Sequence, residues 1–135
     1  MAYRSDVRIV VSNKGYQELK KYVNEHLPED MKKYNLLQNT DVEKITDNQV
    51  YLGWDSIKWY EYADFKEVDT IMAGLKHLDA NDYSYCYARI GEQADDYEEK
   101  YNVSDKEDYL DFPQLERYFD DDYFFNKDKS KDVDI

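Results

Sequence analysis

The chain has 135 residues, of which 31 are acidic and 18 are Lys or Arg, and its formal net charge is −13. This length suits one domain with one sizeable core, and an aromatic content of 16% argues against full disorder. The charge excludes direct nucleic-acid binding and attraction to anionic membranes as leading functions, and favours a basic protein partner.

The first two predicted elements are a strand and an amphipathic helix. Apolar side chains alternate over residues 6–12 and predict a strand. Ser12 is a candidate N-cap for a helix that runs to about Glu25. The apolar positions of this helix recur every three or four residues, so one face can dock on a sheet. These positions are Tyr16, Leu19, Val23 and Leu27.

Two strands, a second helix and a further strand follow. Residues 41–46 and 49–55 read as strands joined at Asp47–Asn48, a pair that tolerates a tight turn. The second helix ends near Leu78 and carries an apolar stripe: Val68, Ile71, Met72, Leu75 and Leu78. Residues 83–90 form the clearest strand, with small side chains on one face and Tyr83, Tyr85, Tyr87 and Arg89 on the other.

The order of these elements, βαββαβ, is that of a ferredoxin-like sheet with two helices on one face. We therefore predict an α+β fold, with a single domain over residues 1–125 and an acidic, aromatic extension from residue 92. Within the extension, residues 92–111 read as a short helix or a loop. Residues 126–135 are predicted to be a disordered tail.

The tyrosine face of the strand at 83–90 allows two interpretations. It is covered by the apolar side chains of the extension, or it is a surface for a partner or for a second copy of the chain. No Lys/Arg stripe accompanies the rings, which argues against the use of this face for stacking RNA bases. The side chains expected to cover the face are Phe112, Leu115, Phe119, Phe124 and Phe125.

The acidic extension is the sharpest candidate site. Residues 92–135 hold 16 acidic and 6 basic residues, so a net charge of −10 lies in this part of the chain. In a helix this would average about one acid per 4 Å, close to the spacing of about 3.4 Å between phosphates along one DNA strand. The alternative is a solvated, solubilising surface. The candidate partner-binding residues are Asp95, Asp96, Glu98, Glu99, Asp105, Glu107, Asp108, Asp120, Asp121 and Asp122, with Tyr97 and Tyr101 as stacking groups.

The sequence offers little for catalysis. His26 and His77 lie in or at the end of predicted helices without a second ligand at zinc spacing. Phosphate-binding loops, nucleophile motifs and calcium loops are missing. We therefore expect no enzyme, no cofactor and no metal. The single Cys86, and an N-terminus without the apolar core of a secretory signal, favour a reducing, cytoplasmic compartment and a thiol that serves as a small core residue.

Two resemblances point to bacteriophages. Residues 2–11 and 51–60, and the segment Arg89–Ile90–Gly91–Glu92, resemble stretches of small phage proteins. Size, acidity and tyrosine content are similar to those of phage inhibitors of host defence, among them anti-CRISPR and anti-restriction proteins that imitate DNA. That group has no defining residue motif, so it implies no site residues. The resemblance implies an inhibitor that occupies a nucleic-acid-binding groove of a host nuclease. The alternative is a non-catalytic adaptor or homodimer that uses the tyrosine face.

Overall fold

The first half of the chain folds as its apolar pattern predicts. The computed structural model describes residues 3–60, 65–93, 95–107 and 110. Strand β1 spans Ser5–Ser12 and helix α1 spans Asn13–His26. Ser12 caps the helix, because its Oγ accepts a hydrogen bond from the Gly15 amide at 2.9 Å. The predicted N-cap is therefore confirmed.

The remaining predicted elements follow in order, and the structure adds two 3₁₀ helices and a fifth strand. Two 3₁₀ helices, η1 (Glu29–Tyr34) and η2 (Leu36–Gln38), connect α1 to the hairpin of β2 (Val42–Ile45) and β3 (Gln49–Ile57). Helix α2 (Lys66–Ala80) and strand β4 (Tyr85–Ile90) come next. The fifth strand is β5 (Tyr97–Asn102), in a segment for which we expected a helix or a loop.

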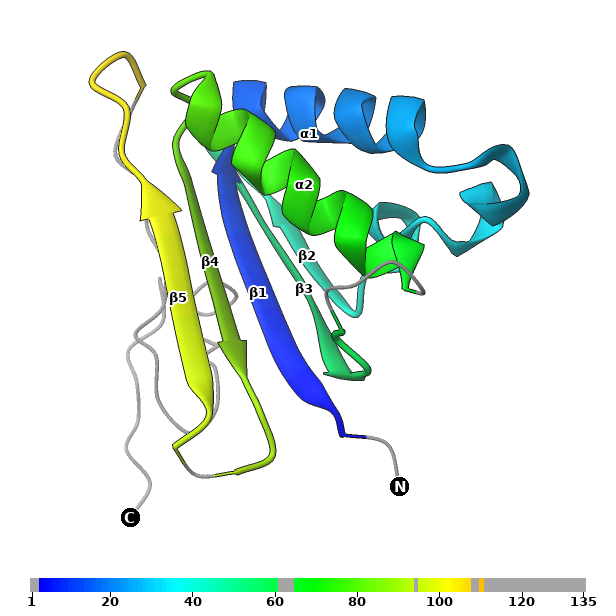
Figure 1. Cartoon of the computed structure of the whole chain (residues 1–135). Coiled ribbons are helices and arrows are strands. Elements are labelled where there is room, and N and C mark those ends of the chain that lie inside the picture. Colours follow the sequence, from blue (N-terminus) through cyan, green and yellow to red (C-terminus); the bar gives the residue numbers. More distant parts are fainter. Residues whose placement is uncertain (1–2, 61–64, 94, 108–109, 111–135) are drawn as a thin grey trace.

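All strands pair antiparallel in one five-stranded sheet of order β2-β3-β1-β4-β5. Both α-helices lie on the same face of this sheet (Figure 1). The protein is therefore an α+β protein, as predicted. Because β5 extends the sheet beyond β4, the strand order is not that of a simple ferredoxin-like fold.

The main core lies between the helices and one face of the sheet. Val7, Ile9 and Val11 of β1 are fully buried there, together with apolar side chains of α1, α2 and β3. Tyr85 and Tyr87 of β4 belong to the same core. The prediction that the tyrosine face of this strand is covered by the C-terminal aromatics or by a partner is therefore wrong, since the helices cover it. Both faces of β4 are apolar enough to be buried, so alternation alone did not identify the helix side.

The opposite face of the sheet carries a smaller core and a buried charge. Leu110 packs against Val10 and Tyr51 on this face. Arg8, 2% exposed, lies beside them and pairs with the Asp55 carboxylate at 2.8 Å. It also donates to the carbonyl oxygens of Val7 and Trp54. A buried guanidinium is tolerated because its donors are satisfied in this way.

Several predicted features fall on residues outside the described part of the chain. These are the tail 126–135 and the end of the predicted domain at residue 125. The same holds for four of the candidate acids and for the five apolar residues expected to cover the tyrosine face: Asp108, Asp120, Asp121, Asp122, Phe112, Leu115, Phe119, Phe124 and Phe125.

Candidate functional site

Strand β5 carries most of the candidate residues, and a tight connection sets its register against β4. The amide of Gly91 donates to the carbonyl oxygen of Asp96 at 2.7 Å, and the Asp96 amide donates to that of Gln93 at 3.0 Å. The pairing then continues from Ile90 opposite Tyr97 to Tyr85 opposite Asn102. The acidic segment after Gly91 is therefore a strand held at the end of the sheet.

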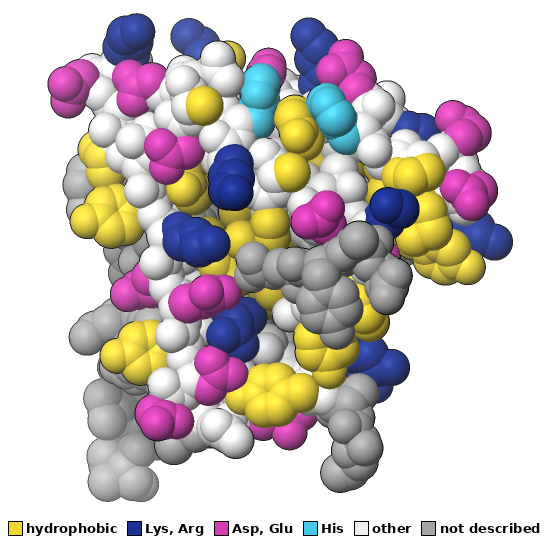
Figure 2. Space-filling model, in the orientation of Figure 1, with side chains coloured by type: hydrophobic (Ala, Val, Ile, Leu, Met, Phe, Trp, Pro, Cys, Tyr) yellow, Lys and Arg dark blue, Asp and Glu magenta, His cyan; other side chains and the backbone are white. Residues whose placement is uncertain are grey.

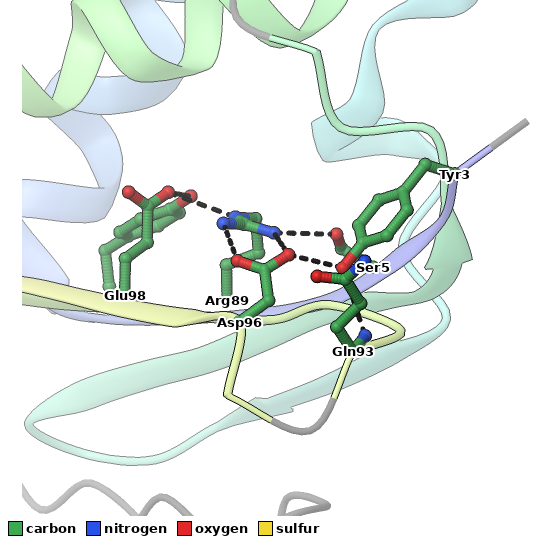
Figure 3. A network of polar contacts seen from close by, with 7 residues as sticks. Tyr3, Ser5, Arg89, Gln93, Asp96 and Glu98 are labelled. Atoms are coloured by element: carbon green, nitrogen blue, oxygen red, sulfur yellow. Dashed lines mark hydrogen bonds and ion pairs between the residues drawn. The ribbon is translucent and has the colours of Figure 1, made fainter.

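Arg89 fastens this connection to the rest of the sheet (Figure 3). Its NH2 and NH1 groups contact the two carboxylate oxygens of Asp96 at 2.8 and 3.2 Å, and its Nε contacts Glu98 at 3.1 Å. NH1 also donates to the Ser5 hydroxyl of β1 at 3.0 Å. One guanidinium thus joins β1, β4, the connection and β5 with a geometry that lysine does not offer.

The hydroxyl of Tyr3 completes the network at its outer end. It donates to Asp96 Oδ2 at 2.5 Å and accepts from the Gln93 amide at 3.1 Å. Hydrogen bonds from Arg89, and then from Tyr3, hold the pKa of Asp96 below its ordinary value. The pKa of Arg89 is raised, first by its hydrogen bonds to Asp96. Both groups are therefore charged at neutral pH.

Gly91 provides the space for this carboxylate. A Cβ at position 91 would lie 2.0 Å from Asp96 Oδ2 and 2.4 Å from the Tyr3 hydroxyl. Any side chain there would displace the network. Arg89 and Gly91, which carried a resemblance in the sequence, are thus structural residues that place β5.

The side of β5 that faces the helices is occupied by internal contacts. Glu98 accepts from the Tyr87 hydroxyl at 2.9 Å, and the Lys100 ammonium lies 6.0 Å from the centre of the Tyr87 ring. Asn102 donates to the carbonyl oxygen of Tyr83 at 2.9 Å. These polar contacts hold the strand where the helices do not extend over it (Figure 1).

The other side of β5 points to solvent. Tyr97, Tyr101 and Val103 are 60, 70 and 56% exposed, and Glu99 is exposed between the two tyrosines. Within the described residues, the side chains of Tyr97, Glu99 and Tyr101 form no hydrogen bond or ion pair. Exposed side chains without internal partners are available for a contact with another molecule.

The six candidate acids that the structure describes divide into two groups. Asp95, Glu99 and Asp105 are exposed. Asp96 and Glu98 are committed to Arg89. Glu107 is also committed to the fold: it accepts from the Ser84 amide at 2.6 Å and from the Ser12 hydroxyl at 2.9 Å. Three of these six candidate acids are thus part of the scaffold, and sequence spacing did not distinguish them.

The space-filling view shows how charge is distributed on the helix-bearing side. Asp and Glu side chains lie interspersed there with Lys and Arg (Figure 2). This side therefore presents no continuous acidic field. Within the candidate set, the exposed acids of the described residues are Glu99 on β5, Asp95 before the strand and Asp105 after it.

Cys86 and the two histidines are the remaining chemically distinctive side chains. Burial, and secondarily the charge of Glu99, raises the pKa of Cys86 to about 11. His77 contacts Glu18 at 2.7 Å, and the ring of Tyr22 stacks between His26 and His77 at centroid distances of 3.9 and 4.9 Å. Among the described residues, no three His, Cys, Asp or Glu side chains are grouped as metal ligands.

Comparison with known proteins adds no relative. Neither a family model nor a curated protein nor a solved structure matches this chain. Within the described residues, every helix is too short or too polar to cross a bilayer.

Proposed function

We propose that this protein is a non-catalytic inhibitor of the bacteriophage type, which binds the basic nucleic-acid-binding groove of a bacterial defence nuclease such as a CRISPR effector. Asp95, Glu99 and Asp105 take the place of phosphates, and Tyr97 and Tyr101 contact the groove beside them. Charge attraction accelerates association, and the aromatic contacts slow dissociation.

The observation that supports this proposal is that the acids on and beside β5 fall into two groups, one paired with Arg89 and the other exposed. Arg89 holds one set of acids in the scaffold, which leaves Glu99 exposed on a strand of fixed register. Because the backbone of this strand is already paired with β4, it need not be ordered when Glu99 meets a cation. A flexible acidic tail would have to be ordered at the moment of binding.

A charge-reversal variant tests the proposal. The triple variant Asp95→Lys, Glu99→Lys, Asp105→Lys should lose capture of a nucleic-acid-binding protein from bacterial lysate, and DNA should compete with capture by the unmodified protein. The matched control is Glu25→Lys, Glu29→Lys, Asp30→Lys, which changes the net charge equally at exposed residues of α1 and η1. Equal capture by both variants, or capture that DNA does not displace, would contradict the proposal.

The second candidate function is a non-catalytic adaptor that associates with itself. Tyr97 and Tyr101, rather than the buried tyrosines of β4, favour it, because large exposed aromatic side chains are typical of protein interfaces. A homodimer that persists at high salt would support this function over mimicry, since mimicry weakens as salt screens charge.

We also propose that β1 to β4 form a ferredoxin-like core to which β5 is added. The order β2-β3-β1-β4 and the two helices on one face support this description. The fold alone implies no function.

A further inference from the structure

The backbone of β5 has an edge directed away from the sheet. The Gly91 amide donates to the carbonyl oxygen of Asp96, and these two residues directly adjoin the pair of Ile90 and Tyr97 with which the ladder of β4 and β5 ends. In an antiparallel ladder, such hydrogen-bonded pairs alternate with pairs whose N–H and C=O groups point outward. Glu98, Lys100 and Asn102 therefore bond to β4, whereas Tyr97, Glu99 and Tyr101 direct their backbone groups outward.

The same three residues also present exposed side chains. Tyr97, Glu99 and Tyr101 lie on one face of the strand, about 7 Å apart in succession, with the tyrosines 60 and 70% exposed. Each therefore offers a backbone edge and a side chain to an added strand. β5 is the last strand of the sheet in the described part of the chain.

We propose that β5 binds an extended, arginine- or lysine-rich segment of a partner protein, which adds to the sheet as a sixth strand. The backbone groups of Tyr97, Glu99 and Tyr101 pair with this segment. A cationic side chain of the segment lies opposite Glu99, where it forms an ion pair and contacts the flanking tyrosine rings. This inference rests on the proposed function and names the element of the basic partner that contacts β5.

Charge decides between this occupant and a second copy of the chain. Two copies of β5 paired antiparallel about Glu99 would place Tyr97 opposite Tyr101, but they would also place Glu99 against its own counterpart. Like charges directly opposite each other destabilise a strand pair. Each molecule also carries a net charge of −13, which repels a second copy. A basic segment meets neither obstacle.

Titration with synthetic peptides tests the inference directly. The probe is a short peptide in which Arg alternates with Thr, and the control peptide has the same charge but contains Pro at every third position, so that it cannot pair as a strand. Calorimetry should show tighter binding of the alternating peptide. Equal affinity for both peptides would mean that the protein attracts positive charge without strand addition, and would overturn the inference.

Variants of β5 separate the contribution of the backbone from that of the side chains. Tyr101→Ala should weaken binding of the alternating peptide roughly threefold through loss of the ring. Tyr101→Pro should weaken it a further roughly fivefold, because it also removes an outward N–H. An edge strand tolerates this change, since the N–H does not bond to β4, and thermal melting verifies that the variant folds. Equal affinities of the two variants would exclude backbone pairing.

Glu99→Lys should weaken binding of the alternating peptide about tenfold, whereas Glu25→Lys on the distant helix α1 should have little effect on it. Equal effects of these two changes would show that net charge alone accounts for the binding.

Failure of the inference is distinguishable from failure of the proposed function. If the Tyr101→Pro variant still captures the lysate protein and the triple charge-reversal variant does not, strand addition is rejected and the proposed mimicry is retained. If the protein forms a salt-tolerant dimer that Tyr101→Pro dissociates, the edge of β5 binds a second copy of the chain, and the proposed binding of a basic segment is rejected.

Discussion

Burial makes Cys86 a poor nucleophile. Burial raises its pKa from an ordinary value of 9.0 to about 11, which leaves about 100-fold less thiolate at neutral pH than an unperturbed cysteine has. We expect a maleimide reagent to label the folded protein correspondingly slowly, and to label the urea-unfolded protein at the rate of a free thiol. Rapid labelling of the folded protein would show that β4 opens or that the thiol is accessible.

Asp96 gives the folded state a dependence on pH. Because its pKa is lowered on folding, its contribution is fully present above the unfolded value, near 3.8, and is lost as the pH falls through the folded value. Asp96→Asn should therefore cost about 1–3 kcal/mol of unfolding free energy at neutral pH. The two proteins should converge in strong acid, where the carboxyl is protonated in both the folded and the unfolded chain. Urea unfolding across a pH series measures the difference, and a constant gap down to the lowest pH would contradict this role.

At the scale of elements, β3 approaches β1 closely at one glycine. A Cβ on Gly53 would lie 2.2 Å from the Val7 carbonyl oxygen and 2.5 Å from Arg8 Cδ. We expect Gly53→Ala to destabilise the fold by about 1–3 kcal/mol, because neither the strand backbone nor the buried guanidinium can move aside without losing contacts. Thermal and urea unfolding measure the cost. Unchanged stability would show that the sheet adapts at this point.

The elements that the sequence predicts are those with an apolar period. The alternation in β1 and the three-to-four spacing in α1 identified both, and Ser12 marked their boundary. β5 was missed because its sequence, Tyr-Glu-Glu-Lys-Tyr-Asn, is polar on both faces, and polar contacts to β4 hold it in place. The turn between Gly91 and Asp96, which joins β4 to β5, is the signal from which a hairpin could have been predicted.

The candidate site could be predicted only in part, for a related reason. The sequence indicates that acids gather after Gly91, and three of them are exposed as expected. Which acids belong to the scaffold depends on contacts between residues far apart in the chain, such as Tyr3 with Asp96 and Ser12 with Glu107. Local spacing contains no trace of such contacts, so Asp96 and Glu98 were grouped with Glu99.

At the scale of the whole molecule, net charge and the position of charge have separable effects. A molecule of charge −13 repels itself, and salt should stabilise it by screening that repulsion. Each of the two triple charge reversals proposed above adds two units at three positions and brings the net charge to −7. Both variants should therefore melt at similar temperatures, with a weaker dependence on salt than the unmodified protein.

Their binding should nevertheless differ, because only the variant at Asp95, Glu99 and Asp105 changes the edge on which we place the partner. Melting curves at low and high salt, measured beside binding of the Arg-Thr peptide, give both quantities on the same samples. Equal melting with unequal binding is the expected pattern, since self-repulsion depends on total charge and recognition depends on where Glu99 lies between its two tyrosines. Equal binding would mean that the acidic field acts as a whole, with no role for the geometry that Arg89 maintains.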